Sequence, residues 1–191
     1  LALVVKEPAG VVGLILPWNF PLLMAAWKVA PALAAGWCVI VKPAEQTPLT
    51  CLYLAELASK AGVPDGVFNV TPGLGETTGE AIGRHKDIDV VSFTGSTEVG
   101  GYFMKYSGES NLKNIGLEMG GKSPFIVLDD AVINDNLIEH AAMAAFWNGG
   151  ENCSANMRHL VDVSLMDEYT DRIIARAKKF KVGDPLDPNT D

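Results

Sequence analysis

The chain has few of the residues that build disulfide frameworks and metal sites. Its 191 residues include three cysteines and three histidines. These are scattered and form none of the close pairs that a disulfide-rich scaffold or a metal knuckle needs. This sparing use of cysteine favours a reducing compartment, so we expect a cytoplasmic protein. No metal site is predicted.

Long apolar runs and an excess of positive charge are also missing. No apolar run approaches the roughly 20 residues of a membrane span, and the run Val11–Leu16 stops at Pro17. Fifteen Lys and Arg against 23 Asp and Glu leave a net charge of −8, whereas nonspecific binding to nucleic acid needs a positive surface. We therefore expect neither a membrane nor a nucleic-acid partner. The 48% of hydrophobic residues predict a globular chain with ample core.

The apolar residues that are present form short runs between glycine and proline signals, and helical patterns lie between the runs. The runs are too short for helices and predict buried strands. The predicted strands are Val11–Leu16, Cys38–Val41, Val67–Val70, Val90–Phe93 and Phe125–Leu128. The predicted helices are Leu22–Ala35 with a kink at Pro31, Leu49–Ala61, Glu80–Arg84, Glu98–Tyr106, Asn134–Trp147 and Leu165–Lys179. This alternation predicts an α/β fold with an open, parallel, Rossmann-like sheet and helices on both faces.

The character of the chain changes near Gly120 and Gly121. Before them the pattern is a regular strand–helix alternation. After them come a strand, a long helix, a polar glycine-rich loop and one more strand–helix unit. We predict two domains, residues 1–119 and the start of a second α/β domain in 120–191. The turn-rich last residues favour a piece of a longer protein. In a parallel sheet, ligands bind beyond the carboxyl ends of the strands.

The three cysteines have different surroundings. Cys38 lies in an apolar strand and is interpreted as a core thiol. Cys51 opens a helix, whose dipole could lower the pKa of its thiol, but nothing reactive surrounds it in sequence. Cys153 lies in a polar, glycine-rich loop directly after a helix, where a thiolate could meet a ligand. Cys153 is the candidate nucleophile, and an ordinary loop cysteine is the alternative.

Glu118 is the candidate general base. It lies in an apolar context and is followed by two glycines, Gly120 and Gly121, that permit a tight turn. Partial desolvation there would suit a carboxylate that takes up a proton. The alternative is a glutamate that turns to solvent at the end of a strand.

Two glycine-bearing segments each follow a strand and precede a helix. Residues 73–79 nearly match the dinucleotide fingerprint, with one residue too many before the last glycine. Residues 95–100 open a helix whose first amides could hold a pyrophosphate. Either segment could equally be a plain strand–helix turn.

Two further loops follow predicted strands. Pro17–Pro21 encloses Asn19 between two aromatic and two proline residues, a rigid loop that could present one amide to a developing oxyanion. The alternative is an asparagine that hydrogen-bonds its own backbone. Lys42 and Glu45 place a cation and an acid after the next strand, which elsewhere would be a solvated loop.

Together these segments resemble the NAD(P)-dependent aldehyde dehydrogenase superfamily. Residues 117–124 (LEMGGKSP) match its glutamate signature and residues 146–155 (FWNGGENCSA) its cysteine signature, in the same order and at the same separation. Residues 17–21, 41–45 and 93–97 match three further blocks of the family. The resemblance covers essentially the whole chain.

The resemblance implies oxidation of a small-molecule aldehyde to a carboxylic acid. In it Cys153 attacks the aldehyde carbonyl, and the oxyanion is held by the side chain of Asn19 and the backbone N–H of Cys153. The resulting thiohemiacetal is oxidised to a thioester, and Glu118 activates the water that hydrolyses it. Lys28 matches a lysine that assists proton movement near Glu118, although its own sequence context favours a surface lysine.

The resemblance also implies NAD as the cofactor, preferred over NADP. Glu45 would bond the ribose 2′-hydroxyl and repel a 2′-phosphate. The residues that match cofactor contacts are Lys42 and Glu45 at the adenosine ribose, Gly75 and Gly79 beside adenine, Ser96 at the pyrophosphate, and Thr94 and Gly95 near the nicotinamide.

By the same resemblance, residues 1–119 are the end of a linking strand and part of a dinucleotide-binding domain, and residues 120–191 begin the catalytic domain. Family enzymes are longer on both sides, and we expect the full-length protein to be a homo-oligomer. The loop around Cys153 looks most similar to the betaine-aldehyde and aminoaldehyde branch. Two alternatives stay open: an incomplete nucleotide-binding fragment without turnover, and a Cys-dependent esterase.

Overall fold

The computed structural model describes every residue from Leu1 to Asp191. The chain forms two compact units, Leu1–Met119 and Gly120–Asp191, which are described separately. Residues 1–10, where the end of a strand was expected, form no helix or strand.

The first unit contains a five-stranded sheet in which every pairing is parallel. Its strands are β1 (Val11–Ile15), β2 (Cys38–Lys42), β3 (Phe68–Val70), β4 (Val90–Gly95) and β5 (Asn114–Met119). They lie in the order β3-β2-β1-β4-β5. The predicted α/β class is confirmed. Strand β5 was not predicted, because Gly116 and Glu118 interrupt what would otherwise be an apolar run.

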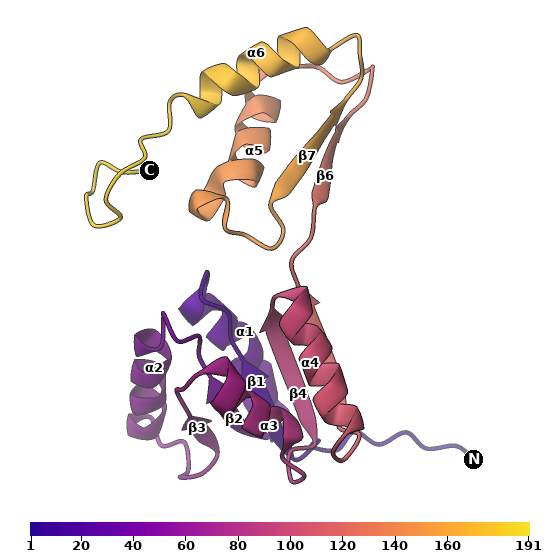
Figure 1. Ribbon diagram of the computed structural model, residues 1–191, viewed down its shortest axis with the longest axis vertical. Helices are drawn as coiled ribbons and strands as arrows, with labels where there is room; N and C mark the ends of the chain where they lie inside the picture. The colour runs from indigo at the N-terminus through magenta and orange to yellow at the C-terminus, as the bar shows by residue number, and fades with distance from the viewer. The chain divides into compact units, whose positions relative to one another are not determined.

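Helices cover both faces of this sheet (Figure 1). They are α1 (Pro21–Ala34), α2 (Leu49–Lys60), the short α3 (Glu80–Arg84), which follows a π-helical turn η1 (Gly75–Gly79), and α4 (Thr97–Gly108). Pro21 suits the first turn of α1, where its missing N–H costs nothing, and Gly36 follows the end of the helix with φ +78°. Helix α1 continues through Pro31 as one element.

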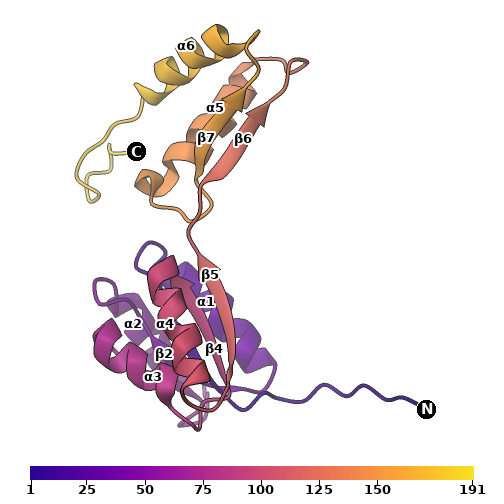
Figure 2. The same cartoon turned by 45° about the vertical axis from the view of Figure 1, so that its right-hand side comes forward.

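Each face of the sheet has its own core. On one face Val12 and Leu14 pack with Met24 and Val29 of α1 and with Cys51 of α2. On the other face the cluster joins Ile15, Val91 and Phe93 of the strands to Ile82 of α3 and Phe103 of α4. The alternation of neighbouring strand residues between the two clusters follows the pleat of the strands. Helices α3 and α4 lie side by side over this second face (Figure 2).

The second unit contains two parallel strands and two helices. Strand β6 (Ser123–Val127) pairs with β7 (Asn156–Val161), and α5 (Asp135–Phe146) and α6 (Met166–Ala177) accompany them. Asn134 caps α5 through its side chain, which accepts the Leu137 N–H at 2.9 Å. Val127, Ile138 and Tyr169 lie in the core that joins the strands to the helices.

Candidate active site

The loops after β1 and β4 lie at the point where the strand order reverses. Strand β1 is the central strand, its sequence neighbour β2 lies on one side and β4 on the other. In open parallel sheets such a switch point is where ligands bind. Asn19 lies in the loop after β1, and Ser96 follows β4 as the N-cap of α4, accepting the Val99 N–H at 3.3 Å. The structure thus brings the Asn19 loop and the Ser96 cap to one end of the sheet.

Four residues predicted to contact the cofactor gather at the end of β2. The Nζ of Lys42 lies 3.0 Å from Oε1 of Glu45 and donates to the Pro43 carbonyl at 3.1 Å. A Cβ on Gly75 would lie 3.7 Å from Glu45 Oε1, and one on Gly79 would lie 3.8 Å from Cδ of Lys42. The η1 turn therefore passes close to the Lys42–Glu45 pair, and the two glycines leave the space around it open.

Glu45 keeps its negative charge in this setting. Partial burial acts to raise the pKa of Glu45, but hydrogen bonds from its own backbone and from Lys42 outweigh burial, so the pKa lies below its ordinary value. Its side chain is 35% exposed. An ionised, partly exposed carboxylate can accept hydrogen bonds from ribose hydroxyls, which fits the adenosine end of NAD.

The end of β4 supplies a second feature that fits a bound dinucleotide. Thr94 is buried, and its Oγ1 has no hydrogen-bond partner within the chain. A buried hydroxyl without a partner is costly and invites one from a ligand. At Gly95 a Cβ would lie 2.6 Å from Cζ of Phe93, so the close passage of the backbone over that ring requires glycine.

Glu118 lies on β5 in register with Thr94 of β4. Glu118 is exposed, so the expected desolvation of its carboxylate is not seen in this structure. The prediction took the apolar neighbours in sequence as a burial signal. Those neighbours alternate along β5, and Leu117 points to the opposite face, where it packs with the α3–α4 cluster.

Lys28 is buried, whereas its sequence context favours a lysine on the surface. It lies on the buried face of α1, is 9% exposed, and its Nζ lies 2.6 Å from Oγ of Ser92 on β4. Burial lowers the pKa of Lys28 to about 8, with the negative field of Glu118 acting in the opposite direction. Ser92 is a residue that the sequence analysis missed, because a serine inside an apolar strand carries no motif.

Cys153 lies in the second unit, on the loop between α5 and β7, and its thiol is exposed. After α5 the chain turns through Asn148 (φ 54°), Gly149 (φ 67°) and Gly150 (φ 76°). Non-glycine residues rarely adopt this left-handed conformation, and asparagine tolerates it best. The glycine-rich sequence thus permits the reversal that puts the thiol on the surface of the unit.

Asn152 shapes the loop immediately around the thiol. Its Oδ1 accepts the N–H and the hydroxyl of Ser154, each at 3.1 Å, and the Cys153 thiol at 3.8 Å. The backbone N–H of Ala155 donates to the Asn152 carbonyl at 3.0 Å. This Asx turn fixes the backbone on both sides of Cys153. Asn152 was not among the predicted site residues, although an asparagine two residues before a serine can indicate such a turn.

The other two cysteines are held differently. Cys51 is fully buried in the first core, and burial raises the pKa of its thiol to about 11. The notion that a helix dipole might activate it is therefore wrong: desolvation dominates. Cys38, at the start of β2, is half-buried rather than deep in the core.

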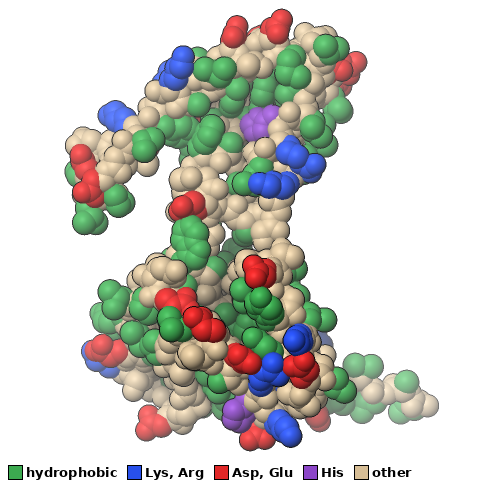
Figure 3. All heavy atoms as spheres, in the orientation of Figure 1, with side chains coloured by type: hydrophobic (Ala, Val, Ile, Leu, Met, Phe, Trp, Pro, Cys, Tyr) green, Lys and Arg blue, Asp and Glu red, His purple; other side chains and the backbone are tan.

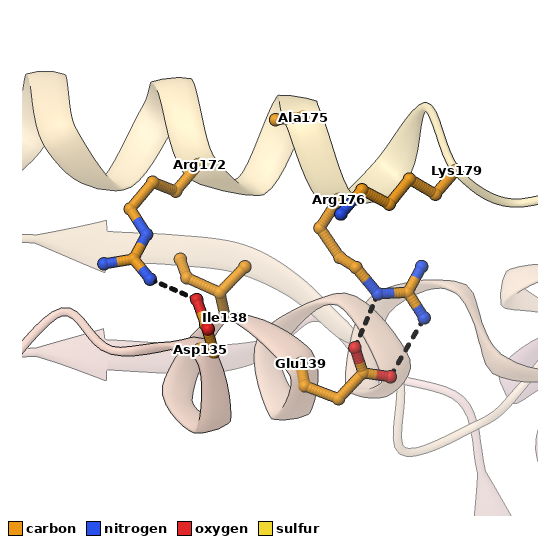
Figure 4. Close-up of a pocket in the computed structure, with 7 residues that line it drawn as sticks. All are labelled: Asp135, Ile138, Glu139, Arg172, Ala175, Arg176 and Lys179. Atoms are coloured by element: carbon orange, nitrogen blue, oxygen red, sulfur yellow. Dashed lines mark hydrogen bonds and ion pairs between the residues drawn. The ribbon is translucent and has the colours of Figure 1, made fainter.

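Figure 4 shows a groove between α5 and α6, and the two arginines that line it are paired with carboxylates. Nη2 of Arg172 lies 2.6 Å from Oδ1 of Asp135, and Nε of Arg176 lies 2.5 Å from Oε2 of Glu139. Such exposed ion pairs contribute little to stability. None of the residues predicted to carry chemistry lines this groove.

No group of three or more His, Cys, Asp or Glu side chains is placed to hold a metal ion. None of the helices combines the length and apolarity of a membrane span. On the face drawn in Figure 3, Lys and Arg side chains lie among Asp and Glu and form no continuous basic surface.

The fold and these residues define a class: an α/β unit built on a five-stranded parallel sheet, followed by a unit that presents a cysteine on a turn. The sequence model of the aldehyde dehydrogenase family matches residues 1–191, the whole chain. The chain therefore belongs to the aldehyde dehydrogenase family. The resemblance noted from the signature segments is confirmed.

Individual relatives agree. The chain is 57% identical over 188 residues to an aminoacetaldehyde dehydrogenase of Pseudomonas aeruginosa, covering 98% of this chain and 38% of that protein. The crystal structure of the aldehyde dehydrogenase KauB from Pseudomonas aeruginosa matches with a TM-score of 0.94 at 52% identity, over 96% of this chain and 37% of that one.

A betaine aldehyde dehydrogenase from Staphylococcus aureus, solved in complex with NAD⁺, matches with a TM-score of 0.92 at 44% identity, over 97% of this chain and 36% of that one. The chain thus spans a little over a third of the length of the relatives it matches.

Proposed function

We propose that a full-length protein carrying this chain oxidises an aldehyde to a carboxylic acid, with NAD as the cofactor and Cys153 as the nucleophile. The observation that carries the proposal is the contrast among the cysteines. Cys153 alone is exposed, on a loop fixed by the Asx turn of Asn152, within a chain that belongs to the aldehyde dehydrogenase family.

The proposed chemistry begins with covalent attack. The Cys153 thiolate adds to the aldehyde carbon, and the carbonyl oxygen becomes an oxyanion. The Asn19 side-chain amide and the Cys153 backbone N–H donate hydrogen bonds to that oxygen, which stabilises charge where it develops. Bound NAD would supply the hydride acceptor. When the former aldehyde carbon gives up its hydride, a thioester remains on Cys153.

Hydrolysis of the thioester then needs a base. Glu118 takes a proton from a water molecule, the water oxygen adds to the thioester carbon, and the C–S bond breaks to release the acid and the Cys153 thiolate. Glu118 suits this role because it is exposed on β5, where water reaches it. Lys28, whose pKa lies at about 8, is a nearby group that can accept the proton in turn.

The residues that would hold NAD lie at the ends of β2 and β4 and in the η1 turn. Lys42 and Glu45 would bind the adenosine ribose, and Gly75 and Gly79 would leave room for adenine. The helix that Ser96 caps would receive the pyrophosphate, since its first amides point outward with the positive end of the dipole. Thr94 and Gly95 would lie near the nicotinamide, where the free Thr94 hydroxyl gains a partner.

The first substrate to test is a small amino aldehyde. The relative that is 57% identical is named an aminoacetaldehyde dehydrogenase. An esterase is the second candidate function, since an exposed thiol and a carboxylate can cleave an activated ester without any nicotinamide. Addition of NAD separates the two, because protein fluorescence changes on binding only if the dinucleotide site forms.

Rapid mixing of the Glu118→Gln variant with aldehyde and NAD tests the proposed division of labour. The substitution keeps the side-chain volume and removes the base. A burst of about one equivalent of NADH per site should remain, followed by turnover about 10²–10⁴-fold slower than normal. Loss of the burst at every pH, with Cys153 still open to alkylation, would show that Glu118 acts before the thioester forms.

A further inference from the structure

Lys28 is a buried lysine whose side chain donates a hydrogen bond to a hydroxyl. It lies on the core face of α1, among Met24, Ala25 and Val29, and its Nζ lies 2.6 Å from Oγ of Ser92. A buried cation without a partner is very costly. The hydroxyl of Ser92 therefore has a defined task in a strand that is otherwise apolar up to Thr94.

The sheet register places this contact beside Glu118. Ser92 of β4 lies in register with Gly116 of β5, and Thr94 with Glu118. Residues in register on neighbouring strands point to the same face, as do residues two apart on one strand. A Cβ on Gly116 would have only a backbone oxygen, at 4.0 Å, within contact range. One face of β4 and β5 therefore carries two hydroxyls and a carboxylate, with an open position between Ser92 and Glu118.

We propose that Ser92 is a positioning residue that holds Lys28 for proton exchange with Glu118, because a hydroxyl can pair with either the ammonium or the amine form of that lysine. This inference rests on the proposed function. The Ser92 oxygen accepts from the ammonium, and on rotation its O–H donates to the lone pair of the amine. Lys28 can then lose and regain a proton with its Nζ in place. A carboxylate partner would instead hold the ammonium form.

The charges around Lys28 support exchange. Strands β1 and β4 carry no titratable side chain, β2 ends at Lys42, and α2 brings Cys51, whose raised pKa keeps it a neutral thiol. Glu118 from β5 is the charge that acts on Lys28. With burial lowering the pKa of Lys28 to about 8, both forms are populated close to neutral pH.

Three substitutions at Ser92, made in the full-length protein, test the inference. Brief pulses of acetic anhydride at a series of pH values modify only unprotonated amines, and peptide mapping reports the Lys28 midpoint. The hydrogen bond of Ser92 is stronger to the charged ammonium than to the neutral amine, so Ser92→Ala should lower the midpoint by about one pH unit. Ser92→Thr keeps the hydroxyl and should leave the Lys28 midpoint at its wild-type value, whereas Ser92→Asp should raise the midpoint.

Steady-state turnover gives the same midpoint independently of reagent access. Turnover should rise with pH as Lys28 loses its proton, and this limb should move with the labelling midpoint while the KM for NAD stays unchanged. Ser107→Ala is the matched control, because it removes another buried hydroxyl, 2.7 Å from the Lys113 carbonyl, away from Lys28.

Two outcomes would overturn the inference: no movement of the kinetic limb in Ser92→Ala and Ser92→Asp, or an equal loss in Ser107→Ala. Failure of the unaltered protein to form NADH from aldehyde and NAD would instead overturn the proposed function, while the Lys28 labelling midpoints would still report whether Ser92 governs its protonation.

Discussion

The two units hold their polar side chains in opposite ways. In Leu1–Met119 the cations Lys28 and Lys42 are buried, fixed by a core helix and by the end of a core strand. In Gly120–Asp191 Cys153 is exposed, and its loop is shaped by positive φ angles and by the hydrogen bonds of Asn152. The first unit thus depends on sheet packing to place its chemistry, and the second depends on local turns.

The largest effect on activity should come from substituting Cys153, the proposed nucleophile in the second unit. In the full-length protein, Cys153→Ser should reduce aldehyde oxidation to background, because serine at this position lacks a thiolate. Cys38→Ala and Cys51→Ala should keep the chemistry and lower only the melting temperature, since Cys51 packs in the core of the first unit and Cys38 is half-buried on β2. NADH formation and thermal melts on the three variants measure this. Full oxidation by Cys153→Ser would show that another group is the nucleophile.

The next effect concerns the loop after β1. Asn19→Ala should slow the NADH burst about 10²–10³-fold, the usual consequence of losing one donor to an oxyanion. Asn69→Ala is the matched control, because Asn69 donates to the backbone of Gly66 and Val39 at the opposite end of the sheet strands. It should lower stability and leave the burst rate intact. Equal slowing in both variants would mean that Asn19 only supports the fold.

A smaller effect is expected at the Lys42–Glu45 pair. The wild-type protein should have a higher kcat/KM with NAD than with NADP, because the ionised Glu45 repels a 2′-phosphate. Glu45→Gln removes that charge and should lower the ratio of kcat/KM with NAD to kcat/KM with NADP by about tenfold or more. Comparing kcat/KM for the two cofactors decides it, and a wild-type preference for NADP would refute the assignment.

The smallest effect is on stability and depends on pH. The pKa of Lys28 is lowered from 10.5 to about 8 in the folded chain, so below about pH 8 folding must bury a charged amine. That cost disappears as pH rises from about 8 to 10.5, because the folded lysine loses its proton first. Lys28→Met should therefore be the more stable protein at pH 7, with an advantage that shrinks over this window.

Denaturant unfolding at several pH values measures the difference between Lys28→Met and wild type. Lys60→Met, which changes an exposed lysine of α2, is the control. A constant difference from pH 7 to 10.5 would contradict the buried-amine account of Lys28.

The sequence predicted what depends on local pattern and missed what depends on neighbours in space. Strands β1, β2 and β4 and helix α3 follow from apolar runs and their stop signals, within a residue or two for the strands. Strand β5 was missed because a glycine and a glutamate break its pattern, and only pairing with β4 makes it a strand.

The same distinction applies to the site. The signature segments around Glu118 and Cys153 could be recognised because their residues are adjacent in sequence. The hydrogen bond between Lys28 and Ser92 joins residues 64 positions apart in sequence, and no sequence periodicity predicts it. The burial of Lys28 was missed for the same reason, since a lone lysine on a helix is usually solvated.

The central claim is that an acyl group forms on Cys153, and acid quenching of the Glu118→Gln reaction tests it most directly. The variant is mixed with aldehyde and NAD, quenched after the burst, digested at low pH and mapped by mass spectrometry. The account predicts the acyl mass on the peptide that contains Cys153 and none on those with Cys38 or Cys51. An acyl group on either of those peptides, or a full burst with no acyl peptide at all, would contradict it.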